Sequence, residues 1–182
     1  MSDHTYTLKI CGLERELQLV EVSPGLKIAS FVILGDTELV CRVAPEIVKR
    51  LPPLDILITA EAKGIPLVFE ISRLLGTNYL IARKSVKPYM KDPLVDRVVS
   101  ITTQKEQMLC LDGKDAQAVR GKRVAIIDDV ISTGESVNAL ERLISKAGGT
   151  VVAKAAILAE GDASKLKDII YLQELPLFPT EK

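Results

Sequence analysis

Apolar and polar side chains alternate along the first part of the chain, in residues 5–22, with Cys11-Gly12 midway. A period of two is typical of strands that bury one face, and a glycine-containing pair between two such runs favours a tight turn. This part of the chain therefore predicts a β-hairpin. Residues 23–25, Ser-Pro-Gly, break the pattern, and residues 26–34 resume it as a further extended piece.

From residue 45 onward the pattern changes to short, continuous apolar runs that alternate with segments of helical periodicity. The expected strands are residues 55–60, 78–82, 122–127, 150–159 and 169–173, and the expected helices are residues 45–51, 64–75, 135–147 and 163–167. Residues 95–101 and 107–111 predict two strands joined by a polar turn. Apolar strands that alternate with helices are typical of a parallel sheet covered on both faces. We therefore expect a single α/β domain, with a core over residues 41–182 and a β-rich segment, residues 1–40, attached to it.

Composition and charge narrow the functional classes. The 182 residues include 24 basic and 24 acidic side chains, so the chain lacks the basic surplus of a nucleic-acid-binding protein. No apolar run is long enough to span a bilayer, so no membrane partner is expected. Three widely spaced cysteines, Cys11, Cys41 and Cys110, argue against a disulfide framework or a zinc site and favour a reducing, cytoplasmic location. The only histidine, His4, lies near the N-terminus, so catalysis by a histidine base is not expected.

The stretch VAIIDDVISTGES, residues 124–136, places two adjacent acids, Asp128 and Asp129, directly after four apolar residues. Two neighbouring carboxylates repel each other, and burying them is unfavourable. An alternative interpretation is that Ser132 or Thr133 caps the following helix and that the helix dipole merely stabilises the nearby acids. That alternative explains the cap but not two acids behind a buried run, so we expect a ligand here.

The loop after the acids has the features of an anion site. Ser132, Thr133 and Ser136 supply hydroxyl donors, Gly134 lets the backbone approach a ligand, and a helix N-terminus favours negative charge. The loop lacks the lysine of a Walker A motif and the spacing of a dinucleotide-binding loop. Two carboxylates beside a phosphate can accept hydrogen bonds from sugar hydroxyls and lie near Mg²⁺. A 5-phosphoribosyl group has this combination of phosphate and vicinal hydroxyls.

These thirteen residues resemble the phosphoribosyl pyrophosphate (PRPP) signature of type I phosphoribosyltransferases: four apolar residues, two acids, two apolar residues and a small-Thr-Gly loop. Further similarity to the adenine and xanthine enzymes of that family is carried by four segments. They are LDILITAEAKGIP (54–66), similar to the pyrophosphate loop, LIARKSVKP (80–88), similar to an arginine-lysine stretch, SPGLKIASF (23–31), similar to a base-binding hood, and VVSITTQKEQMLCL (98–111), similar to a loop that closes over PRPP. Residues 1–22 have no counterpart in this resemblance.

The resemblance implies a role for each matching position. Asp128 and Asp129 would hold the ribose hydroxyls and, with Lys84, take part in catalysis. Mg²⁺ would lie near the two aspartates, held largely through PRPP and water. The implied PRPP-binding residues are Ala62, Lys63, Gly64, Arg83, Lys84, Lys87, Asp128, Asp129, Ser132, Thr133, Gly134, Glu135 and Ser136. The implied base-binding residues are Leu26, Lys27, Phe31 and Glu160. For Phe31, stacking on the base and packing in the core are both open.

The activity implied by the resemblance is purine salvage. Such an enzyme transfers the 5-phosphoribosyl group from PRPP to a purine base and gives a nucleoside 5′-monophosphate and pyrophosphate. Its site needs no strong nucleophile, because it holds the leaving group with cations and Mg²⁺, aligns the base and excludes water. Closure of residues 92–108 would exclude the water. The family also implies a homodimer.

Four positions depart from the family pattern and bear on the choice of base. Lys63 stands where the adenine enzymes carry arginine, and Thr102 where they carry a loop glutamate. Ile33 replaces an asparagine and Gly161 a lysine that the xanthine enzymes use on the base, which favours adenine. The alternatives are a xanthine or hypoxanthine/guanine phosphoribosyltransferase, and a PRPP-binding regulator without catalysis. A regulator needs a DNA-binding module, for which the 22 N-terminal residues are too few.

Overall fold

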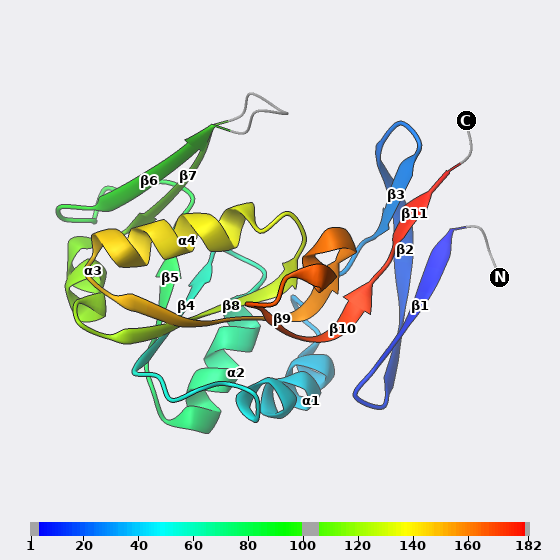
Figure 1. Ribbon diagram of the computed structural model, residues 1–182, viewed down its shortest axis with the longest axis horizontal. Helices are drawn as coiled ribbons and strands as arrows, with labels where there is room; N and C mark the ends of the chain where they lie inside the picture. The colour runs from blue at the N-terminus through cyan, green and yellow to red at the C-terminus, as the bar shows by residue number, and fades with distance from the viewer. Residues whose placement is uncertain (1–3, 100–105, 181–182) are drawn as a thin grey trace.

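A five-stranded parallel sheet forms the centre of the computed structural model, which describes residues 4–99 and 106–180. Its strand order is β10-β9-β8-β4-β5, and every neighbouring pair is parallel (Figure 1). The strands are β4 (Ile56–Ala60), β5 (Tyr79–Ala82), β8 (Arg123–Ile131), β9 (Thr150–Glu160) and β10 (Ile170–Leu175). This sheet confirms the predicted parallel α/β core.

Helices cover both faces of this sheet. One face carries α1 (Thr37–Val48) and α2 (Ile65–Leu75), and the other carries α3 (Gly113–Val119) and α4 (Glu135–Lys146) (Figure 1). Adjacent residues of β8 serve opposite faces, since Ile126 belongs to the hydrophobic cluster of α4 and Ile127 to that of α1 and α2. Because both faces are buried, the strand needs apolar residues at every position, which explains its unbroken apolar run.

A second sheet, the hood sheet, stands at one end of the molecule and is antiparallel, in the order β1-β2-β3-β11 (Figure 1). Its strands are β1 (Thr5–Ile10), β2 (Leu13–Ser23), β3 (Leu26–Ala29) and β11 (Leu177–Pro179). The predicted hairpin with its turn at Cys11-Gly12 is confirmed. Strand β3 is shorter than the predicted extended piece. Strand β11 was not predicted, because three residues carry too little pattern and their partner strand lies at the other end of the chain.

The helix predicted over residues 45–51 is wrong. Helix α1 begins at Thr37, ends at Val48 and contains Pro45 in its interior. Proline inside a helix costs about 3 kcal/mol because it removes one backbone hydrogen bond and crowds the preceding turn. The burial of five side chains along one face of α1 outweighs that cost; they are Leu39, Val40, Val43, Ala44 and Ile47. The boundary predicted at residue 40 falls inside this helix.

Three further differences concern element ends and short helices. Strand β8 continues past the predicted end at residue 127 to Ile131. The short helix expected over residues 163–167 is a 3₁₀ turn, η1 (Gly161–Lys165), and α3 was not predicted. None of the helices in the described parts of the chain is long and apolar enough to cross a membrane.

An antiparallel hairpin of β6 (Leu94–Val99) and β7 (Glu106–Leu111) lies beside α4, as predicted (Figure 1). The predicted end of the first strand at residues 100–101, and Thr102, lie outside the described residues. Asp96 attaches the hairpin to α4: its carboxylate is 4% exposed and accepts from Arg142 Nε at 2.9 Å and Lys146 Nζ at 2.6 Å. Burial alone would raise the pKa of Asp96, but these two cations lower it below the usual aspartate value.

We expect Asp96→Asn to lower the free energy of unfolding by about 1–3 kcal/mol at pH 7, because a buried acceptor loses its charge-assisted bonds. The pKa of Asp96 is lower in the folded protein than in the unfolded chain, so its charged form stabilises the fold at pH values above the unfolded-state pKa. This stability is lost as the pH falls through the folded-state pKa. The difference between wild type and variant should therefore shrink below about pH 4. Urea unfolding at pH 7 and pH 3 measures this. Asp162→Asn, at an exposed ion pair, is the control and should change little.

Candidate active site at the carboxyl ends of the strands

A cavity of about 480 Å³ opens at the carboxyl ends of β4 and β8. The predicted site residues that line it are Ala62, Lys63, Lys84, Asp128, Asp129, Glu135 and Ser136. Loops that follow three different strands thus meet in one hollow, as expected for ligand sites in open parallel sheets. Side chains that the sequence did not single out complete its wall; they are Ala60, Glu61, Met108, Leu109, Val130 and Ala139.

The two aspartates lie within β8, not after it, because the strand continues to Ile131. Asp129 is 6% exposed, and its Oδ2 has no hydrogen-bond partner within the described part of the chain. The backbone N–H of Asp129 donates to Asp128 Oδ1 at 2.9 Å. Burial, followed by the neighbouring carboxylate, raises the pKa of Asp128, and the Lys63 ammonium only partly offsets this. Asp129 Oδ2 is therefore the oxygen of the pair that still lacks a donor or a cation.

The aspartate pair fits Mg²⁺ only as a cation shared with a bound ligand. Among the described residues no group of three or more His, Cys, Asp or Glu side chains is arranged to hold a metal ion. Mg²⁺ commonly binds through one or two carboxylates together with substrate phosphates and water. The orphaned Oδ2 of Asp129 is an acceptor for such a hydrated cation or for a ligand hydroxyl. Residues 128 and 129 therefore suit the water-mediated role predicted for them.

The N-terminus of α4 opens into the same region without a side-chain cap. Gly134 is the N-cap residue, with φ of 77°, and no side chain bonds to the cap position. The N-cap is therefore Gly134 and not Ser132 or Thr133, although the Thr133 hydroxyl oxygen accepts from the Glu135 N–H at 3.4 Å. Glycine adopts this left-handed backbone without strain, and the hydroxyls of residues 132, 133 and 136 remain exposed. The remaining free N–H groups and the helix dipole favour an anion at this end, and phosphate binding here stays a prediction.

The loop 61–64 lies against the ends of both β4 and β8. Its Glu61–Ala62 peptide bond is cis. At Gly64 a Cβ atom would overlap Thr59 Oγ1 and lie 3.3 Å from the Ile127 carbonyl oxygen. Only glycine permits this approach, which holds the backbone of Ala62 and Lys63 at the rim of the cavity.

The predicted cations do not all point into the cavity. Lys63 and Lys84 line it, whereas Arg83 lines a separate cavity, and its Nε donates to Glu61 Oε2 at 3.1 Å. Lys87 Nζ donates to Ser85 Oγ at 2.6 Å. Glu61 also accepts from the backbone N–H of Lys84, and this bond foremost, with Arg83, lowers the pKa of Glu61. Glu61 thus joins two loops of the site, a role that no sequence motif indicated.

The four residues predicted to bind a base do not line the cavity. Leu26 and Lys27 lie on β3, and Glu160 ends β9 and is 8% exposed. The ring of Phe31 is 4% exposed and belongs to the hydrophobic core, so this structure favours the packing alternative. The Phe31 carbonyl oxygen accepts from Lys63 Nζ at 3.4 Å, which connects this segment to the site loop. Base contact by these four residues stays a prediction.

We expect Gly64→Ala to lower the free energy of unfolding by about 1–3 kcal/mol, because the added methyl overlaps a buried side chain and backbone. Removing the hydroxyl with Thr59→Ala should relieve part of this loss in the double variant, so the two effects should not add. Thr59→Val keeps an atom at the same place and should give no relief. The effects of Thr59→Ala and Thr59→Val alone are first subtracted from the unfolding free energies of the two double variants. Equal values after this subtraction would contradict the proposed overlap. Urea denaturation of wild type, the three single variants and the two double variants measures these free energies of unfolding.

Comparison with known proteins gives the site a family. The model of the phosphoribosyl transferase domain matches residues 53–177. A hypoxanthine/guanine phosphoribosyltransferase of Methanococcus voltae is 34% identical over 144 residues, which cover 78% of this chain and 73% of the relative.

Solved structures agree on the fold. The adenine phosphoribosyltransferase of Thermoanaerobacter pseudethanolicus superposes with a TM-score of 0.72 at 22% identity, covering 87% of this chain and 95% of the other. The adenine phosphoribosyltransferase of Trypanosoma brucei, solved with AMP, pyrophosphate and ribose-5-phosphate, gives a TM-score of 0.60 at 19% identity, covering 88% and 86%. The family model and the curated relative together place this chain in the phosphoribosyl transferase domain family, among the purine phosphoribosyltransferases, which are enzymes of the glycosyltransferase type.

Proposed function

We propose that this chain transfers the 5-phosphoribosyl group of PRPP to a purine base and releases pyrophosphate. One observation carries the proposal: an aspartate pair with an unpartnered buried carboxylate oxygen faces the same cavity as two lysines, next to a helix N-terminus whose N-cap is a glycine. Hydroxyl donors, a polyanion and a phosphate would satisfy these three features in turn. PRPP presents all of them in one molecule.

Each part of the cavity then has a share in binding PRPP. Asp128 and Asp129 accept hydrogen bonds from the ribose hydroxyls, which supplies the donors that the pair lacks. Residues 132–136 bind the 5′-phosphate through backbone N–H groups and hydroxyls. Backbone groups of residues 62–64, with Lys63 and Lys84, bind the pyrophosphate. Mg²⁺ bound with PRPP would supply further positive charge for the pyrophosphate oxygens.

The reaction needs positioning more than proton transfer. A ring nitrogen of the base donates its electron pair to the anomeric carbon while the bond from that carbon to the pyrophosphate oxygen breaks, and the proton on that nitrogen passes to water or to the departing pyrophosphate. The bonding electrons leave with pyrophosphate, and positive charge develops on the sugar. Lys84 faces the leaving group and stabilises its charge, while the nearby carboxylates favour the positive sugar. The cavity walls hold the base in line and keep water from the sugar.

Two purine classes are candidates for the base. Adenine is supported by Ile33 and Gly161, which lack the donors that a 2,6-dioxopurine would use. Ile33 is also fully buried, so its side chain stays in the core. A 6-oxopurine, hypoxanthine or guanine, is supported by the name of the archaeal relative at 34% identity. We propose adenine as the first base to test and hypoxanthine or guanine as the second.

The test incubates the protein with PRPP, Mg²⁺ and each of adenine, hypoxanthine, guanine and xanthine, and reads nucleoside monophosphates by mass spectrometry. Product from one base supports the proposal and identifies the substrate. Asp128→Asn and Asp129→Asn should each lower kcat/KM by about 100-fold, because the ribose hydroxyls lose charged acceptors. Asp168→Asn, an exposed partner of Lys154, is the matched control and should keep full activity.

Binding of PRPP without product from any of the four bases would reject purine transfer. It would favour the alternative of a PRPP-binding regulator. Absence of both product and PRPP binding would reject the assignment of the cavity itself.

We also propose that the protein acts as a homodimer in the cytoplasm. Free cysteines at residues 11, 41 and 110 support a reducing compartment. A dimer is supported by apolar side chains near β5, the last strand of the central sheet. Phe69 is 53% exposed, and its ring contacts the Tyr79 ring edge-on, with 6.3 Å between the ring centroids. Tyr89 is 65% exposed and lines a cavity together with Tyr79. Exposed aromatic groups of this kind are enriched at protein interfaces.

We expect light scattering after size exclusion to give about twice the chain mass of 19.9 kDa. Phe69→Glu should shift the protein toward the monomer, because a charge would enter an apolar interface. Leu166→Glu is the control, since Leu166 is an exposed leucine elsewhere on the surface and its change should leave the mass unaltered. A monomeric wild type at assay concentration would contradict the dimer.

A further inference from the structure

Arg15 occupies a position where the pattern of its strand calls for an apolar residue. The inner face of the hood sheet carries Leu8 and Leu17, both buried in the hydrophobic core. Arg15 lies directly opposite Leu8 in the register of β1 and β2, so its side chain points to the same face. Neither the phosphate loop nor the aspartate pair accounts for a cation here.

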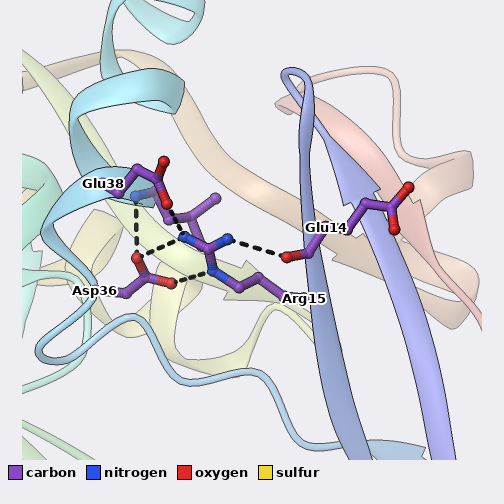
Figure 2. Close-up of polar contacts among 5 residues, drawn as sticks. Glu14, Arg15, Asp36 and Glu38 are labelled. Carbon is purple, nitrogen blue, oxygen red and sulfur yellow. Dashed lines mark hydrogen bonds and ion pairs between the residues drawn. The ribbon is translucent and has the colours of Figure 1, made fainter.

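The guanidinium of Arg15 joins the hood sheet to the start of α1 (Figure 2). Its Nε lies 2.7 Å from Asp36 Oδ2, and its Nη2 lies 3.0 Å from Asp36 Oδ1, so the pair is bidentate. Nη2 also donates to Glu38 Oε2 at 2.8 Å, and Nη1 donates to the Glu14 carbonyl oxygen at 3.0 Å. Asp36 is the N-cap of α1 and accepts from the Leu39 N–H at 3.1 Å. One carboxylate therefore both caps the helix and fixes the strand.

Residues 30–36 connect β3 to α1, and they are held at two places. Asp36 is fixed by Arg15 at one end. Near the other end, the Phe31 carbonyl oxygen accepts from Lys63 Nζ of the loop that lines the candidate active site. Phe31 and Ile33 are buried in the core between these points. The segment thus links the position of the hood sheet to the loop proposed to bind pyrophosphate.

Apolar contacts between the hood sheet and α1 stabilise the contact without fixing its angle, because the hydrophobic effect is not directional. A bidentate guanidinium–carboxylate pair has a defined plane and distance, and lysine does not reproduce it. We propose that Arg15 is a positioning residue for the pyrophosphate group of PRPP. Through Asp36 it fixes residues 30–36, and the Phe31 carbonyl oxygen of this segment accepts from Lys63 at the cavity. This inference rests on the proposed function for the identity of the ligand.

The test compares Arg15→Lys and Asp36→Asn with wild type in steady-state kinetics. Arg15→Lys keeps the charge but loses the paired N–H donors of the guanidinium, and Asn at residue 36 still caps α1. Each variant should raise KM for PRPP by about tenfold, while kcat and KM for the purine stay within about twofold. The double variant should be no worse than the more affected single variant, because both changes break one contact. Lys9→Met removes an exposed hairpin ion pair with Glu14 and should leave all three constants unchanged.

Amide hydrogen exchange over residues 26–34 gives a readout that does not depend on turnover. Exchange should be faster in Arg15→Lys and Asp36→Asn than in wild type and Lys9→Met. If wild type makes no nucleotide, the proposed function fails, and exchange alone decides whether Arg15 holds the segment. If wild type is active but KM for PRPP is unchanged in both variants, or all constants worsen together with thermal stability, Arg15 has only a structural role and the inference is overturned.

Discussion

Two adjacent carboxylates in a central strand are the constraint on which the candidate site depends. Asp129 is buried on β8, and one of its oxygens lacks a partner among the described residues. Burying such groups is unfavourable unless donors or a cation are supplied. Around them the chain assembles partial compensation from the Lys63 ammonium and the N-terminus of α4. A sugar with vicinal hydroxyls and a bound cation would supply the hydrogen-bond donors and positive charge that are still missing.

The parallel sheet makes this arrangement possible. Because all five strands run in the same direction, the loops after β4, β5 and β8 emerge at one edge and reach a common cavity. Gly64 then allows the loop 61–64 to lie directly on the ends of β4 and β8. Glu61 joins that loop to the backbone of Lys84. The cavity is thus built from close backbone contacts, which suits a site that must hold a polyanion in one position.

The hood sheet is attached to this core by a contact of a different kind. Most of its inner face is apolar and packs on α1, but Arg15 and Asp36 introduce one directional pair into that face (Figure 2). The same connecting segment reaches Lys63 through the Phe31 carbonyl oxygen. The hood sheet is therefore connected to the loop 61–64 by polar contacts as well as by apolar packing.

The sequence by itself determined the α/β class, the N-terminal hairpin and the position of the aspartate pair before the loop proposed to bind phosphate, because periodicity and short motifs are local properties. It misplaced α1, since only five side chains packed against the core show why a helix tolerates Pro45. It missed β11, whose pairing with β3 joins distant parts of the chain. It treated neighbouring cations as equivalent, although Lys84 faces the cavity and Arg83 turns to Glu61. Side-chain direction and long-range pairing follow from packing between elements, and only the tertiary structure decided them.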